Sequence, residues 1–179
     1  MRPALLALML ALSVTSGVAG HAAAETVLTV AGRIGEVNRG PYNAFRDAFF
    51  KHHERTFENA FSFTHEALKR LPQKSITARF DNWPNAVTAK GPSLANVLEV
   101  VRAPDGAKLK VVALDGYAAE FEAKDIASHD WIVAIEADDK PLGIGGRGPT
   151  WLMFDTGGKT LKAEDEALWV WSAFMIVVE

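Results

Sequence analysis

The chain has 179 residues, with 19 basic and 22 acidic side chains, a formal net charge of −3 and no cysteine. No block of Lys and Arg stands out, which excludes a basic surface for nucleic acid. The absence of cysteine excludes disulfides, thiolate metal ligation, cysteine catalysis and iron–sulfur clusters. A chain of this length favours one domain with its own core.

The first 24 residues are typical of a secretory signal peptide. Arg2 supplies a positive start, residues 4–14 form an apolar run, and an A-x-A cleavage motif ends at Ala24. The run is shorter than the ~20 residues of a membrane helix, and no later stretch reaches that length. We therefore expect residues 1–24 to be a signal peptide and residues 25–179 to be an exported, periplasmic domain without a transmembrane segment. The alternative is an uncleaved membrane anchor.

The domain begins with a strand and continues into an aromatic segment. Val27, Leu28 and Val30 stand among polar neighbours and predict a strand over residues 25–34. After a loop, residues 42–61 carry aromatic side chains at helical spacing. This spacing predicts one or two helical turns or an aromatic-rich excursion.

Two short helices are expected on either side of a second strand. Thr64 is a suitable N-cap for a helix that ends near Arg70. Residues 74–80 alternate polar and apolar side chains and predict a half-buried strand. Ser93 is a suitable N-cap for a second helix, because residues 94–101 have apolar side chains at i, i+3, i+4 and i+7.

The remainder of the chain predicts mostly strands. We expect them over residues 108–114, 117–121, 131–137, 151–154 and 169–178, with a helical turn at residues 125–128. Because side chains alternate along a strand, Trp169 and Trp171 are expected on one face. The whole pattern predicts an α+β fold: a single domain with a mixed, mainly antiparallel sheet and few short helices.

Residues 143–148 read GIGGRG and match the G-x-G-x-x-G spacing of a dinucleotide-binding loop. Such a loop follows a strand and precedes a helix whose N-terminus faces the pyrophosphate. Here Pro149 follows the last glycine, and residues 150–154 are strand-like. We therefore predict a glycine-rich connection before a strand. The alternative is an anion site in which backbone amides and Arg147 bind a negative charge.

Histidine-bearing segments offer further candidates. The pairs at residues 52–54 and 65–66 lack H-E-x-x-H spacing, so we interpret them as solvated surface residues and expect no metal. His129 beside Asp130 is the right pair for acid–base work, although a turn leading into the next strand explains it as well. No serine lies in a G-x-S-x-G motif, so no hydrolase nucleophile is visible.

Five segments carry a family resemblance. They are LPQKSITARFDNW (residues 71–83), SLANVLEVV (93–101), KLKVVALDGYAAEFEAKDI (108–126), DDKPLGIGGRGPTWLMF (138–154) and WVWSAFMIVV (169–178). In this order they resemble the oxidoreductase molybdopterin-binding domain, the sulfite oxidase fold, and especially its small exported members. The resemblance covers residues 25–179, with residues 38–56 as an insertion. It implies a mixed α+β domain with a cleft for the pterin phosphate and pyran ring.

In the enzymes of that family one cysteine thiolate ligates molybdenum, and the resemblance places its position within residues 79–83. Phe80 cannot bind a metal, and Asp81 or Asn82 would offer oxygen, a different donor from thiolate. The basic and histidine-bearing segments that hold the pterin phosphate are also not evident. We therefore expect the fold without its chemistry, as a cofactor-free ligand- or partner-binding module. The alternatives are a molybdopterin-dependent oxidoreductase with a non-cysteine metal ligand set, and a purely structural interaction protein.

The same resemblance predicts a cleft beside residues 79–83. We expect it to be lined by Arg79, Asp81, Asn82, Trp83, Tyr117 and Arg147. The arginines offer fork-shaped donors for an anion. Trp83 offers a flat face for a planar ligand, with structural packing of its loop as the alternative, and most of the other tryptophans are expected in the core. The expected partner is a small anionic or planar ligand, or a membrane-bound sensor or redox protein. The alternative is that Arg79 pairs with Asp81 on a solvated surface and binds nothing.

Overall fold

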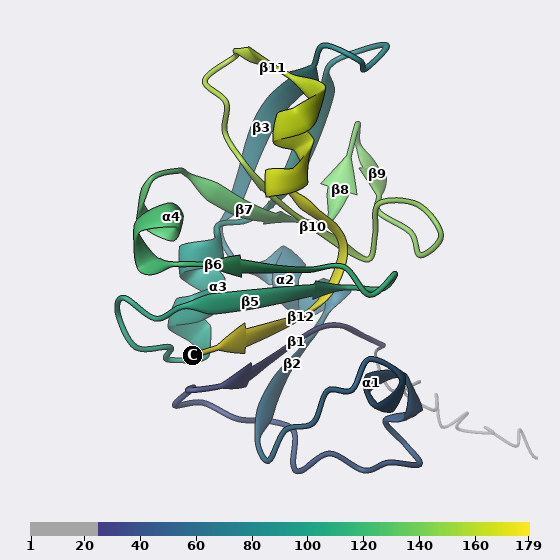
Figure 1. The fold of residues 1–179 in the computed structure, drawn as a ribbon, viewed down its shortest axis with the longest axis vertical. Coiled ribbons are helices and arrows are strands. Elements are labelled where there is room, and N and C mark those ends of the chain that lie inside the picture. Colours follow the sequence, from purple (N-terminus) through teal and green to yellow (C-terminus); the bar gives the residue numbers. More distant parts are fainter. Residues whose placement is uncertain (1–24) are drawn as a thin grey trace, which may run out of the picture.

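The computed structural model describes residues 25–179, so the expected signal peptide lies outside the described residues. Two β-sheets dominate this part of the chain (Figure 1). The strands of the first sheet are β1 (Thr26–Gly32), β2 (Ala60–Thr64), β5 (Leu109–Ala113), β6 (Ala118–Phe121), β7 (Trp131–Ala134), β10 (Thr150–Phe154) and β12 (Val170–Val178). Their central order is β2-β1-β12-β10-β7, and β5 pairs with both β12 and β6.

The second sheet has the order β11-β3-β4-β8-β9. Its strands are β3 (Gln73–Phe80), β4 (Val87–Pro92), β8 (Glu136–Ala137), β9 (Lys140–Pro141) and β11 (Thr160–Leu161). Among the strand pairs of residues 25–179, only β1 with β12 and β11 with β3 are parallel. The predicted mixed, mainly antiparallel architecture is therefore confirmed.

The helices are short, as predicted. They are α1 (Ala48–His52), α2 (His65–Arg70), α3 (Leu94–Val100), α4 (Ala123–Ala127) and the 3-10 helix η1 (Ala163–Leu168). Thr64 Oγ1 accepts a hydrogen bond from the Ala67 amide at 3.1 Å, and Ser93 Oγ accepts one from the Asn96 amide at 3.1 Å. Both predicted N-caps are therefore confirmed. No helix within residues 25–179 is long and apolar enough to cross a membrane.

The seven-stranded sheet has an apolar cluster on each face. Because successive side chains of a strand point to opposite faces, Val30 enters the main core and Ala31 enters a second cluster. The second cluster packs Phe174 of β12 against Phe50 and Phe57. These two residues belong to the segment between β1 and β2, which contains the expected insertion. That segment thus covers the second face of the sheet.

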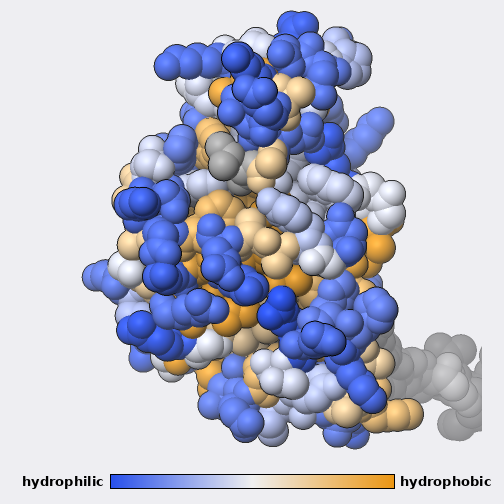
Figure 2. Space-filling model, in the orientation of Figure 1, coloured by the Kyte–Doolittle hydropathy of each residue, from blue (hydrophilic) through white to orange (hydrophobic). Residues whose placement is uncertain are grey.

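Figure 2 shows one face of the molecule. Hydrophilic side chains cover most of this face, and apolar side chains are exposed in its middle, over β5, β6 and β12.

Two predictions at the level of strands are wrong, and some strands were not predicted. The strand expected over residues 131–137 is divided at Ile135, whose amide donates to Lys90 O in β4, so the chain passes from the first sheet to the second there. β2 and β4 were not expected. Trp169 is buried because its ring packs against Phe80, Trp83 and Trp151, whereas Trp171 is 40% exposed, so the two side chains do not share one environment.

The GIGGRG segment forms turns that lead directly into β10, and β10 is antiparallel to both of its neighbours. The predicted loop before a strand is therefore confirmed, and the segment lacks the βαβ setting of a dinucleotide site. Ser172 fixes the loop to β12, because its amide donates to Arg147 O at 2.8 Å and its Oγ donates to Gly146 O at 2.9 Å. This fixation sets the position of the Arg147 side chain.

Candidate functional site

An aromatic cluster lies between the end of β3, β10 and the start of β12. Trp83 stacks at tilted and edge-on angles with Phe80, Trp151 and Trp169, with ring centroids 4.9, 5.8 and 6.3 Å away. Such offset geometries are the favoured ones for aromatic pairs. Trp151 and Trp169 are 1% exposed and Trp83 is 9% exposed. Trp83 is therefore part of the core as well as of the candidate site.

Arg147 lies over this cluster. Its guanidinium carbon is 5.0 Å from the ring centroid of Trp83 and 4.5 Å from that of Trp151, which is cation–π geometry. Its Nη1 donates to Glu166 Oε1 at 2.7 Å, and Trp83 Nε1 donates to Glu166 Oε2 at 3.3 Å. One carboxylate thus joins the arginine to an indole, and the three side chains hold one another in place.

Glu166 was not predicted as a site residue. It belongs to η1, which lies beside β3 as the yellow coil in Figure 1. Asp81 Oδ1 accepts from the Ala163 amide at 3.0 Å at the start of this helix, and Tyr117 Oη donates to Ala167 O at 3.0 Å near its end. Asp81 and Tyr117 therefore position the segment that carries Glu166.

The other two predicted site residues lie apart from this group. Arg79 is exposed on β3 at the register position of Thr160, and within residues 25–179 its side chain makes no hydrogen bond or ion pair. It does not pair with Asp81. Asn82 is exposed in the turn after β3. The structure thus brings together Trp83 and Arg147, with Tyr117 and Asp81 supporting them through η1.

Two clefts flank the Arg147–Glu166 pair. The first has a volume of about 370 Å³ and is lined by Trp83, Pro84, Asn85, Ala86, Val87, Ala137, Asp138, Arg147 and Trp151. The second has a volume of about 220 Å³ and is lined by Ala113, Asp115, Tyr117, Glu166, Ala167, Trp169 and Trp171. The indole nitrogens of Trp151 and Trp169 are buried and have no acceptor in the described part of the chain. An unpaired buried donor costs about 1–3 kcal/mol, so an acceptor that reached it would be stabilising.

The histidine candidates take other roles. The ring of His53 packs against Phe49 and Phe174, with Nε2 buried, which contradicts its interpretation as a solvated surface residue. His129 Nδ1 lies 2.7 Å from Ser128 Oγ, whereas Asp130 pairs with Lys74 at 3.2 Å. Asp130 therefore does not orient His129 for acid–base work.

The donor set at the position implied for molybdenum does not suit that metal. Phe80 is fully buried among the aromatic rings, Asp81 is engaged with η1, and Asn82 faces solvent. Across residues 25–179 no three His, Asp or Glu side chains are grouped to hold a metal ion, and the sequence has no thiolate. These residues therefore do not fit a protein-bound molybdenum.

Comparison with known proteins supports a relation at the level of fold. No protein-family model and no curated protein matches the sequence. Among solved structures, the chain is similar to the sulfane dehydrogenase SoxCD from Paracoccus pantotrophus, with 15% identity and a TM-score of 0.56 over 86% of this chain. The match covers 38% of that chain, so this protein spans well under half its length. At this identity the likeness defines only the class of fold, a mixed-sheet domain of the sulfite oxidase type.

Proposed function

We propose that this domain is a cofactor-free binding module for a small planar ligand at the Trp83–Arg147–Glu166 site. The observation that carries the proposal is the guanidinium of Arg147, which is fixed over two indole faces beside the buried, unpaired indole N–H of Trp151. An arginine held in this way is pre-organised, so little side-chain freedom is lost on binding. The remaining N–H groups of its fork are available to an acceptor.

The charges around the first cleft favour a planar ligand of low net charge over a strong anion. Glu166 neutralises Arg147, and the carboxylate of Asp138 also lines the cleft. A strong anion would have to displace Glu166 or approach Asp138. The volume of about 370 Å³ lies at the small end of ligand sites. A flat compound with acceptor atoms at its edge would accept from the N–H groups of Arg147 that Glu166 leaves free.

A thermal-shift series tests this function with three compounds: pterin and adenine as planar neutral rings, and benzoate as a planar anion. At ~100 times its dissociation constant, a ligand should stabilise the fold by about 2.7 kcal/mol. We expect this gain from a neutral ring, and a smaller one from benzoate at the same concentration.

Variants then locate the site. We expect Arg147→Ala to lose the stabilisation by ligand. Arg79→Ala should keep it, because Arg79 makes no hydrogen bond or ion pair within residues 25–179 and lines neither cleft. No stabilisation by any of the three compounds, or a gain that survives Arg147→Ala, would overturn the proposal.

The second candidate is a molybdopterin-dependent oxidoreductase with a non-cysteine metal ligand set. The structural likeness to a sulfane dehydrogenase favours it. Mass-spectrometric metal analysis of protein purified from its native source separates the two functions. Stoichiometric molybdenum would support the oxidoreductase and contradict the cofactor-free module, whereas metal-free protein that still binds a planar ring would support the module.

A further inference from the structure

A third and larger cleft lies between the seven-stranded sheet and the segment that joins β1 to β2. Its volume is about 910 Å³, within the upper range of small-molecule sites. It is lined by Glu25, Thr26, Val27, Thr29, Asn38, Arg39, Arg46, Asp47, Phe49, Phe50, Ser62, Leu114, Ile144, Pro149 and Phe174. None of these residues lines the cleft beside Trp83.

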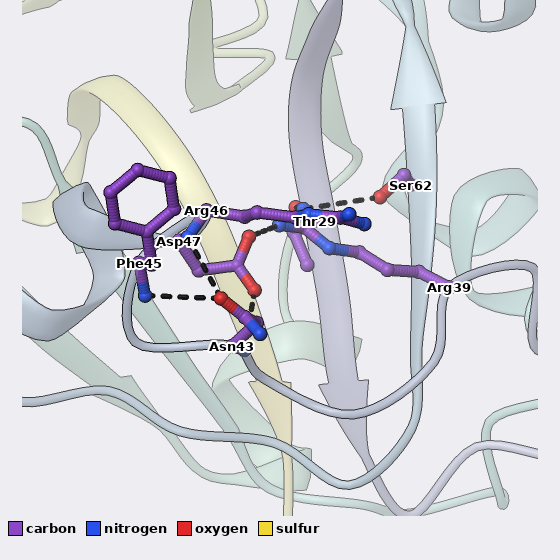
Figure 3. Close-up of polar contacts among 7 residues, drawn as sticks. All are labelled: Thr29, Arg39, Asn43, Phe45, Arg46, Asp47 and Ser62. Carbon is purple, nitrogen blue, oxygen red and sulfur yellow. Dashed lines mark hydrogen bonds and ion pairs between the residues drawn. The ribbon is translucent and has the colours of Figure 1, made fainter.

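One end of this cleft is a fixed polar group centred on Arg39. Its Nη2 forms an ion pair with Asp47, and its Nη1 donates to Thr29 Oγ1 at 3.3 Å and Ser62 Oγ at 3.4 Å (Figure 3). The guanidinium also lies 4.9 Å from the ring centroid of Phe50. Arg39 is thus held on several sides, and its charge is neutralised by Asp47.

Arg46 supplies a second guanidinium whose charge is not neutralised in this way. Figure 3 shows Arg39 and Arg46 extending toward β1 from opposite sides. Within residues 25–179 no carboxylate lies within ion-pair distance of Arg46, and this includes Glu25 at the edge of the cleft. Asn43 Oδ1 accepts from the Arg46 amide at 2.9 Å, which fixes the backbone that carries this side chain. The polar end therefore has one positive charge to offer.

The rest of the cleft is apolar and partly uncovered. Phe49 packs edge-on against Phe174 at 4.9 Å between ring centroids, yet 43% of Phe49 remains exposed. Ile144, from the GIGGRG loop, is 70% exposed at the same cleft. Large apolar side chains left in water at a concave surface are stabilised when an apolar ligand covers them.

We propose that this cleft binds an amphiphilic monocarboxylate. The carboxylate pairs with Arg46, and the apolar body lies against Phe49, Phe174 and Ile144. A single negative charge matches the single uncompensated guanidinium, and Arg is well suited to hold a carboxylate through two parallel hydrogen bonds. This site is separate from the planar-ligand site and does not depend on it.

A displacement titration with dansyl-undecanoate as the fluorescent probe tests the proposal. We expect the probe fluorescence to rise on binding and decanoate to displace it, with decanol at least about tenfold weaker because it lacks the charge. Arg46→Ala should weaken decanoate about tenfold and leave decanol unchanged, and Arg46→Lys should restore part of the loss. Phe49→Ala should weaken both compounds, because it removes apolar contact.

The matched control is Arg70→Ala, an exposed arginine at the end of α2. This variant should bind decanoate as the parent protein does. Equal displacement by decanol and decanoate, decanoate binding that is unchanged in Arg46→Ala, or no binding of the probe would overturn the proposal. Arg46 is exposed, so its replacement leaves the fold intact, which the melting temperature of each variant verifies.

Discussion

Glu166 is central to the candidate site, although the sequence around it does not predict this role. Its two carboxylate oxygens accept from Arg147 and from the Trp83 indole, which lies 83 positions away in the sequence. The family resemblance suggested Trp83 and Arg147, and an indole face and a guanidinium fork are suited to ligands. Nothing in the acidic stretch of η1 distinguishes Glu166 from its neighbours, since only the tertiary contact does so. Arg79 has the right chemistry but faces solvent.

His53 provides a prediction at the same scale. Burial lowers the pKa of its imidazole below 6.5, and the nearby positive charges of His52 and Arg55 lower it further. The folded protein therefore binds this proton less readily than the unfolded chain does. Stability is greatest above the unfolded pKa of 6.5 and falls as the pH drops from there toward the lowered pKa of the folded state.

We expect the urea midpoint to fall between about pH 7.5 and pH 5.5, and to fall less in His53→Phe, whose ring can keep the contact with Phe174. The exposed His129 supplies the control, because His129→Phe should retain the pH dependence of the parent protein. An equal drop in His53→Phe and in the parent protein would show that this imidazole does not carry the effect.

At the scale of elements, the sequence predicts what local signals encode. The caps at Thr64 and Ser93 and the alternation in residues 74–80 act within a few residues, so α2, α3 and β3 were predicted. β4 was not, because Lys90-Gly91-Pro92 has the composition of a turn and becomes a strand through pairing with β3. The end of β7 before Ile135 also depends on a tertiary contact, because the Ile135 amide pairs with Lys90 O of β4.

Gly91 of β4 lies close to β7, so a substitution at Gly91 tests this packing. A Cβ on Gly91 would lie 2.0 Å from Val133 O and 2.7 Å from Ala134 Cα, both backbone atoms that cannot move aside freely. We expect Gly91→Ala to lower the free energy of unfolding by about 3 kcal/mol in urea denaturation, at the upper end for overpacking. Gly143→Ala is the control, because a Cβ there meets no atom within 4 Å. Equal free energies of unfolding for Gly91→Ala and Gly143→Ala would contradict the close approach of β4 to β7.

At the scale of the whole molecule, the segment between β1 and β2 adds a cleft to the fold. It covers the second face of the sheet and forms one wall of the larger cleft, whereas the Trp83 cleft is built from the sheets and η1. The resemblance identified this segment only as an insertion, since its role depends on Phe50 and Phe57 meeting Phe174 across the fold.

Export is a further prediction for the whole chain. The charged start, apolar run and A-x-A motif predict cleavage after Ala24. Mass spectrometry of the protein from its native source should give an N-terminus within a residue or two of Glu25. A retained Met1 would contradict export by cleavage.

The most direct measurement is the indole N–H region of a heteronuclear NMR spectrum, recorded while a planar compound such as pterin is added. The chain has five tryptophans, so five signals are expected, and single Trp→Phe variants assign them. Trp83 and Trp151 line the proposed ligand cleft, whereas Trp131 and Trp171 do not. We predict that the signals of Trp83 and Trp151 shift as the ligand binds, while those of Trp131 and Trp171 stay in place. Unchanged signals for Trp83 and Trp151 at saturating ligand would contradict binding at this site.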